Sequence, residues 1–248
     1  MDKLVHIVDR YEDPSHVFKS CSRDWIVVLR KLPDTNTNES RPVVDPNCAK
    51  FRADKLQVVD IINKFDQTTT DSICDSVYED KQMVYEKGEI IEVKDFDKNV
   101  NIVCAAGIHY YKTMKVAFYL ELERVIDGEW ICWYENGQMY SKRTYKDGKP
   151  EGVWSYWYSH GQMALTGVYK NGEREREWIS WYDNGQMKSN ITYKDGILEG
   201  EYISWYNNGR IELYKTYKGG ELEEEYNGRM NVRYTYRKIP RRRMYFWA

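Results

Sequence analysis

Residues 133–139 read WYENGQM, and the pattern returns as WYSHGQM at 157–163, WYDNGQM at 181–187 and WYNNGRI at 205–211. The glycines of these segments are therefore spaced by 24 residues. A second series of glycines keeps the same spacing: Gly148, Gly172, Gly196 and Gly220. A fixed period in the twenties is typical of repeat proteins, which usually present extended surfaces rather than catalytic pockets. The repeat therefore favours a binding or structural role.

Each repeat carries two turn signals. Asn-Gly or His-Gly marks the first turn, and Asp-Gly, Asn-Gly or Gly-Gly marks the second. Both suit two-residue hairpin turns that need positive φ at their centre. Arms of about eight to ten residues separate the turns, which is an ordinary strand length. We therefore expect two antiparallel strands per repeat and one continuous meander.

Alternating residues assign the faces of this sheet. In the second strand of each unit, Met, Leu, Ile and Tyr share one side, and Lys, Thr and Asn share the other. The first strand has aromatic residues on both sides, with Trp154, Tyr156 and Tyr158 opposite Trp157. Core packing and cross-strand stacking explain these rings most simply, and a platform that stacks a ligand is the alternative.

Units of the form W-x-x-W/Y-Y-x-N-G-Q-M, followed by Y-x-D/N-G and E-G-x-W, resemble MORN repeats. The resemblance is to the longer variant of bacterial antitoxin-like proteins and large DNA viruses, and it covers residues 130–225. We expect a repeat domain over 126–225, followed at 226–248 by a partial capping repeat and a basic aromatic tail. The resemblance implies an interaction or spacing module.

Residues 1–125 lack the repeat and combine strand and helix patterns. Strands are predicted at 25–30, 83–85 and 89–93, and a polar surface loop with three prolines is predicted at 33–46.

Two helices are predicted in the same half. The spacing of Leu56, Val59, Ile61 and Ile62 predicts a helix over residues 53–65, and Thr113 begins a second one through Tyr119. The fold class expected is an α+β N-terminal domain followed by an all-β sheet of stacked hairpins.

The first half also contains four short motifs, at residues 52–55, 84–88, 95–97 and 104–119. In this order they resemble an uncharacterised domain of giant-virus proteins of the mimivirus and marseillevirus type, often attached to repeat arrays. The resemblance implies an origin and a setting, and no activity comes with it.

Composition fits a two-part chain of 248 residues that is 42% hydrophobic and 15% aromatic. No segment reaches the roughly 18 apolar residues that span a bilayer, and residues 1–6 open no apolar signal segment, so we expect a protein that is not secreted. The five cysteines include no C-x-x-C pair. Reduced thiols are therefore expected, with no metal and no cofactor.

The net charge of −2 hides a segregation along the chain. Residues 226–248 carry seven Lys or Arg and no acid, so the remainder carries −9. A basic aromatic tail suits an acidic protein surface, and nucleic acid or anionic lipid are alternatives, as is a tail that folds back on the acidic repeats. No groove-reading motif supports specific nucleic-acid binding.

His109 is the residue that most invites a catalytic interpretation, because it ends a predicted strand five residues after Cys104. A Cys–His mechanism needs hydrogen-bond reach and an orienting group, neither of which the sequence places. The ordinary alternative is a histidine that holds backbone groups. No nucleophile elbow, P-loop, dinucleotide or H-E-x-x-H motif occurs, so we do not expect an enzyme.

Three functions remain open. The first, which we favour, is a non-enzymatic structural scaffold that binds other proteins as a minor capsid-type virion component, in the virion or the host cytoplasm. The second is an intracellular regulatory binder akin to antitoxin-like MORN proteins, and the third is an enzyme centred on His109. The residues expected to contact a partner are Arg241, Arg242, Arg243, Tyr245, Phe246 and Trp247 of the tail, with Trp133, Trp157, Trp181 and Trp205 of the repeats.

Overall fold

The computed structural model describes residues 10–77, 81–120, 127–227 and 232–235. The chain divides into two compact units, which are described separately below. The first comprises Met1–Val125 and Trp130–Tyr140, and the second comprises Ile126–Glu129 and Ser141–Ala248.

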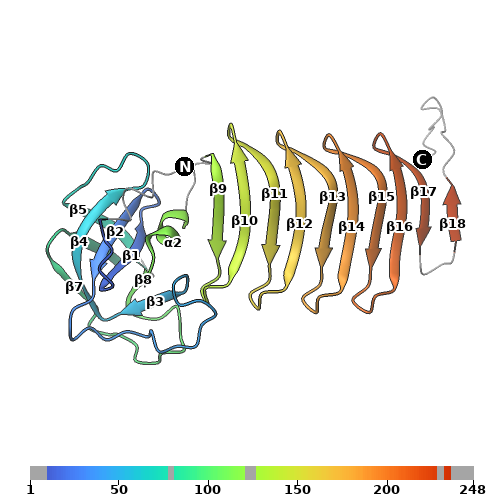
Figure 1. The fold of residues 1–248 in the computed structure, drawn as a ribbon. Coiled ribbons are helices and arrows are strands. Elements are labelled where there is room, and N and C mark those ends of the chain that lie inside the picture. Colours follow the sequence, from blue (N-terminus) through green and yellow to red (C-terminus); the bar gives the residue numbers. More distant parts are fainter. Residues whose placement is uncertain (1–9, 78–80, 121–126, 228–231, 236–248) are drawn as a thin grey trace, which may run out of the picture. The chain divides into compact units, whose positions relative to one another are not determined.

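The first unit is built on a six-stranded antiparallel sheet in the order β3-β8-β1-β2-β4-β7 (Figure 1). Its strands are β1 (His16–Cys21), β2 (Trp25–Arg30), β3 (Lys50–Ala53), β4 (Lys55–Asn63), β7 (Ile90–Glu92) and β8 (Ile108–Tyr111). A separate hairpin of β5 (Ser72–Val77) and β6 (Lys81–Glu86) contributes the buried Tyr85 to the core of the sheet. The helix α2 (Met114–Tyr119) buries Met114, Val116 and Phe118.

The prediction of an α+β domain is wrong, because α2 has only six residues and residues 53–65 form a strand instead of a helix. Leu56, Val58 and Ile61 are all buried in the core. Leu29 pairs with Val58 and Val28 pairs with Asp60, so Val59 is an extra residue that forms a bulge. The bulge changes the spacing of core residues from two to three, which imitates a helix.

Other predicted elements of this unit are confirmed. Strands occupy 25–30 and the neighbourhoods of 83–85 and 89–93, and α2 follows Thr113. The predicted loop at 33–46 has no regular secondary structure except an isolated bridge at Thr37, but part of it is packed inside. The buried Asn38 side chain accepts a hydrogen bond from the Arg52 backbone, 2.9 Å away, and Arg41 is 9% exposed.

The second unit carries the repeats, and it confirms the predicted meander of hairpins. Each strand of the ten-stranded antiparallel sheet pairs with its neighbours in sequence (Figure 1), and all of the sheet except Trp130–Trp133 and Met139–Tyr140 belongs to this unit. The strands are β9 (Gly128–Trp133), β10 (Met139–Lys146), β11 (Lys149–Trp157), β12 (Met163–Lys170), β13 (Glu173–Trp181), β14 (Met187–Lys194), β15 (Ile197–Trp205), β16 (Ile211–Lys218), β17 (Glu221–Asn227) and β18 (Val232–Thr235).

The two turns of each repeat differ in geometry. At the second turn both central residues have positive φ, as in Asp147 (51°) and Gly148 (70°), which confirms the predicted two-residue turn. At the first turn only the glycine has positive φ. Gly137 N donates to Tyr134 O at 2.9 Å and Tyr134 N donates to Gln138 O at 2.8 Å, so this loop has three residues and ends in a glycine bulge.

A ladder of aromatic rings packs one face of the repeat sheet. Trp154 lies between Tyr145 and Tyr169, with ring centroids 5.1 and 4.7 Å apart, and Trp178 continues the ladder 4.8 Å from Tyr169. Both tryptophans are buried. Core packing and stacking therefore explain these rings, as predicted.

Acidic side chains tie each repeat to the next. Glu151 accepts a hydrogen bond from Asn171 N at 2.8 Å, and Glu175 accepts one from Asp195 N at 2.9 Å. Glu199 makes the equivalent bond to Gly219 N. Because the acid of one unit fixes the second turn of the following unit, the 24-residue period is also a period of tertiary contacts.

The first strand of each repeat contains one residue with positive φ. That residue is glycine at Gly128, Gly152 and Gly200, but in the third repeat it is Arg176, with φ 60°. A side chain in this region costs about 1 kcal/mol or more, so Arg176→Gly should raise the free energy of unfolding by about 0.5–1 kcal/mol.

Thermal unfolding monitored by tryptophan fluorescence would measure this gain. The control is Glu177→Gly at the next, exposed residue, whose φ is not positive. Glycine there should destabilise the sheet by about 0.5–1 kcal/mol. Equal destabilisation by both changes would show that Arg176 is unstrained.

Candidate functional site

The residues predicted to contact a partner fall into three groups. Arg241, Arg242, Arg243, Tyr245, Phe246 and Trp247 lie outside the described residues, so the tail stays a prediction. Trp133 belongs to the first unit, where its ring centroid lies 6.4 Å from that of Tyr119. Trp157, Trp181 and Trp205 are half-buried and end β11, β13 and β15.

These three tryptophans form an apolar row with the residues opposite them. The pairs are Trp157 with Met163, Trp181 with Met187 and Trp205 with Ile211, which together we call the Trp–Met row. Met187 and Ile211 are 38% and 43% exposed. Since each repeat adds two strands, successive pairs are about 9.6 Å apart along the sheet.

Backbone positions beneath the row are fixed by hydrogen bonds between repeats. The Tyr158 hydroxyl donates to Trp181 O and the Tyr182 hydroxyl donates to Trp205 O, each at 2.8 Å. The row is therefore a regular array of large side chains on a braced backbone, a property that suits a binding surface.

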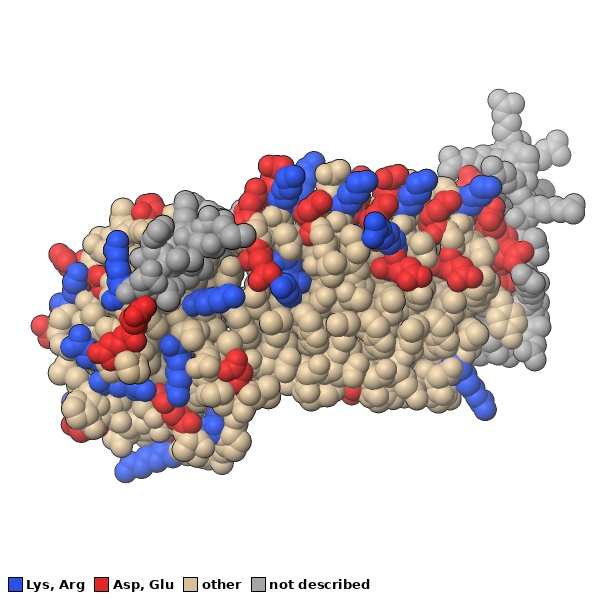
Figure 2. Space-filling view, in the orientation of Figure 1, with Lys and Arg blue, Asp and Glu red and all other residues tan. Residues whose placement is uncertain are grey.

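Charged residues gather at the opposite ends of the strands. Figure 2 shows Lys, Arg, Asp and Glu along one edge of the repeat sheet, whereas the rest of the visible face is largely uncharged. Four lysines end the strands at this edge: Lys146, Lys170, Lys194 and Lys218. Glu151, Glu175 and Glu199 of the same edge hold the turns, so charges of both signs alternate there.

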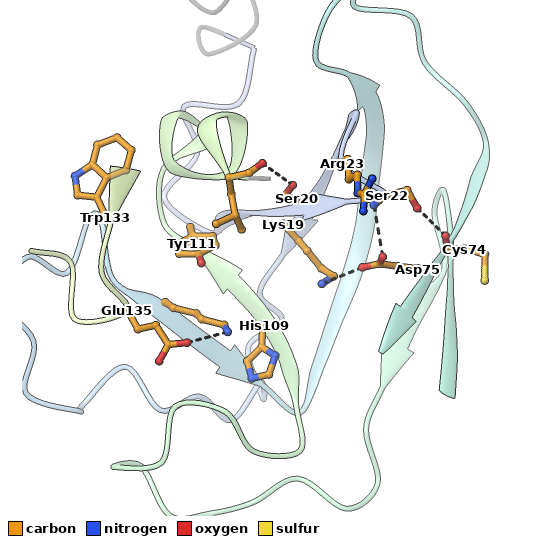
Figure 3. Close-up of a pocket in the computed structure, with 12 residues that line it drawn as sticks. Lys19, Ser20, Ser22, Arg23, Cys74, Asp75, His109, Tyr111, Trp133 and Glu135 are labelled. Atoms are coloured by element: carbon orange, nitrogen blue, oxygen red, sulfur yellow. Dashed lines mark hydrogen bonds and ion pairs between the residues drawn. The ribbon is translucent and has the colours of Figure 1, made fainter. Parts of the chain in front are cut away.

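A cavity of about 680 Å³ lies in the first unit beside His109 (Figure 3). Lys19 contributes an ammonium group 3.3 Å from Asp75, and Lys50 contributes one 3.2 Å from Glu135. Trp133 also lines it. The cavity is therefore polar and contains two ion pairs, which is unlike the apolar lining of most small-molecule sites.

His109 is neutral at physiological pH. Its Nε2 atom lies 3.1 Å from Val103 O, so Nε2 carries the proton and donates it to that carbonyl. Burial and the nearby ammonium groups of Lys50 and Lys19 lower its pKa to about 4. This arrangement matches the ordinary alternative of a histidine that holds backbone groups, and no hydrogen bond to Cys104 is formed among the described contacts.

Cys104 instead contacts Lys50 and Glu135, two residues that the sequence did not single out. Cys104 Sγ donates to Glu135 Oε1 at 3.2 Å, and Lys50 Nζ lies 3.6 Å from Sγ. The three residues are 31 to 85 positions apart, so no local motif connects them. The one sequence signal is that Glu135 stands where later repeats have Ser159, Asp183 and Asn207.

Two structural devices position this cluster. The buried Arg52 guanidinium donates to the carbonyls of Asp97, Asn99, Ile102 and Ala106 and so holds the loop that carries Cys104. Gly137 packs against the backbone of Asp45, while Lys50 N donates to Glu135 O at 3.1 Å. The first NG turn is thereby fixed next to β3.

No group of three or more His, Cys, Asp or Glu suited to a metal occurs in the part of the chain that the structure describes. Within the same residues, no helix has the length and apolar character needed to cross a membrane.

Comparison with family models matches both units. Residues 126–147, 150–171, 177–195 and 198–218 match a MORN repeat variant. The second unit carries a MORN repeat array. Residues 6–117 match a family of unknown function (DUF5758). A comparison with curated proteins found no similar sequence. MORN repeats suggest a scaffold that binds proteins or membranes.

Proposed function

We propose that the MORN array is a protein-interaction scaffold whose contact surface is the Trp–Met row. This role requires no enzymatic step in the array. The observation that carries the proposal is the regular repetition of apolar pairs, because half-buried Trp181 with exposed Met187 and half-buried Trp205 with exposed Ile211 present the same surface one repeat apart. Apolar surface that persists on a folded sheet usually marks a partner site.

Charge favours a protein over a membrane as the partner. Binding to an anionic lipid surface needs clustered basic residues, each worth about 1 kcal/mol near the headgroups. At the charged edge of the array, Lys146, Lys170 and Lys194 alternate with acidic side chains, so the basic charges are offset. The row itself is uncharged. A partner with an extended apolar surface suits it better.

The setting we propose is a virion, with the array attached to coat proteins as a minor structural component. Its support is the resemblance of the N-terminal motifs to domains of giant-virus proteins. An intracellular regulator that masks one target is the alternative. Such a regulator would form a single tight heterodimer instead of assembling into particles.

Proteomics on purified particles, compared with infected-cell lysate, tests the setting. Enrichment in particles is expected, and a photo-crosslinking residue in place of Met187 should attach to a coat protein. The same residue in place of Ile197, which is 50% exposed but belongs to the charged edge, should not. Absence from particles would contradict the virion setting and favour the regulator.

Charge introduced into the row should weaken binding to the crosslinked partner. Ile211→Lys places an ammonium group in the row, and the loss is expected to be at least about tenfold in affinity. Ile197→Lys is the matched control, with the same residues exchanged at a similarly exposed position. Both variants should unfold within about 0.5 kcal/mol of the parent chain. Equal affinities would show that the row is not the contact surface.

A further inference from the structure

The cluster of Cys104, Glu135 and Lys50 has the parts of a nucleophilic site. A thiol nucleophile needs a base that accepts its proton and a donor that stabilises the oxyanion formed by attack on a carbonyl. Glu135 Oε1 accepts the thiol hydrogen bond at 3.2 Å. Lys50 Nζ lies 3.6 Å from the sulfur and 3.2 Å from the same carboxylate oxygen.

Glu135 is in the right protonation state to act as the base. Burial raises the pKa of its carboxyl, but the hydrogen bond from Cys104 and the charge of Lys50 outweigh burial, so the pKa lies below its ordinary value. The carboxyl is thus ionised at neutral pH. In contrast, burial raises the pKa of the Cys21 and Cys48 thiols to about 12, which keeps both protonated.

The thiol of Cys104 is accessible, and a space large enough for a small molecule lies next to its partners. Cys104 is exposed, and it reaches the 680 Å³ cavity beside His109 through its partners Lys50 and Glu135, which line that cavity together with Cys74. That volume is within the range of small-molecule sites, about 300–1,000 Å³. Lys50 Nζ and Glu135 Oε1 form an ion pair at 3.2 Å, and Figure 3 shows Cys74 on the opposite side of the view from Glu135.

We propose that Cys104 is a nucleophilic thiol that accepts an acyl group from small ester substrates bound at the side of this cavity that Lys50 and Glu135 form. The inference is independent of the scaffold role, because it concerns the first unit and needs no residue of the Trp–Met row.

The step conserves atoms and electrons. Glu135 takes the thiol proton as the sulfur attacks the carbonyl carbon, and the oxyanion that forms is stabilised by the Lys50 ammonium. When the carbonyl is restored, the carbon–oxygen bond to the leaving group breaks, and the alcohol or phenol leaves with the proton from Glu135. The products are a Cys104 thioester and the free alcohol or phenol, with no oxidant or reductant involved.

The experiment uses p-nitrophenyl acetate with the full chain at neutral pH. A burst of about one equivalent of nitrophenolate is expected, and peptide mass spectrometry should place the acetyl group on Cys104. Neutral hydroxylamine should remove it, as a thioester requires. Cys74, which is exposed and lines the same cavity, serves as the reference thiol within the molecule, and Cys104 should react at least about tenfold faster.

Variants separate general-base catalysis from simple exposure. Cys104→Ser should abolish the burst, and Glu135→Gln should slow it at least about tenfold. The parent rate should be nearly flat from about pH 6 to 8, because the Glu135 carboxyl stays ionised over that range. These variants should fold, since exposed ion pairs contribute only about 0–1 kcal/mol.

Equal acetylation of Cys104 and Cys74, an unchanged rate in Glu135→Gln, or a burst that persists in Cys104→Ser would each overturn the proposal. The scaffold role is tested separately, because Cys104→Ser should leave crosslinking from position 187 unchanged.

Discussion

Arg52→Met is expected to lower the free energy of unfolding of the first unit by about 4 kcal/mol or more. Arg52 is fully buried, and its guanidinium donates to four backbone carbonyls in the segment 97–106. Methionine fills similar space but donates no hydrogen bond, so four carbonyls lose a charged donor. The Phe96 ring, 5.0 Å from the guanidinium carbon, also loses its cationic partner.

Hydrogen exchange measured by mass spectrometry would locate this effect. Amides of residues 94–107 should exchange much faster, while the MORN array keeps its protection. Arg52→Lys keeps the charge but lacks the planar fork that reaches several carbonyls, so it should recover only part of the stability. The control is Arg30→Met at an exposed strand end, with an expected change within about 0.5 kcal/mol. A change that small at Arg52 would contradict the role of its guanidinium.

Gly137→Ala is expected to destabilise the first unit far more than the same change in a later repeat. An added Cβ would lie 2.1 Å from Asp45 O and 2.9 Å from Asp45 C, so the backbone itself must move. Gly209 occupies the equivalent turn with a similar φ, 79° against 84°, and has nothing within 4 Å. Both variants carry the cost of positive φ, about 1–2 kcal/mol. Only Gly137→Ala adds a clash, worth about 1–3 kcal/mol more.

Chemical denaturation combined with hydrogen exchange over residues 44–50 would measure the difference. Because Glu135 lies two residues before Gly137, this variant should also slow acylation of Cys104, whereas Gly209→Ala should not. Equal costs for the two alanine variants would show that the close approach to Asp45 carries no strain.

Several features of the MORN array were predictable because each repeat contains its own folding signals. Glycines set the turns, strand lengths follow from the spacing, and the positions of Trp154 and Trp178 on one face follow from alternation. The ties from Glu151 to the turn at Asn171, and from Glu175 to Asp195, were not predicted, because the 24-residue spacing of the acids does not show which turn each one contacts. The three-residue geometry of the first turn was not predictable either, because Asn-Gly fits both two-residue and three-residue turns.

The N-terminal fold was harder to predict because its alternation is interrupted. The bulge at Val59 places Val58 and Ile61 on one face at helical spacing, and only the run of β-branched residues pointed to a strand. A bulge depends on the pairing between β2 and β4, which is a property of two segments and not of one.

The sequence by itself determined the repeat architecture, the number of hairpins and the apolar positions at the first turns, since these depend on residues that are near each other along the chain. Only the tertiary structure decided that Lys50, Cys104 and Glu135 meet beside a cavity, and that Gly137 must be glycine. Those contacts join residues from β3, the loop held by Arg52 and the turn after β9. Long-range packing brings these segments together, and no local pattern records the distance between them.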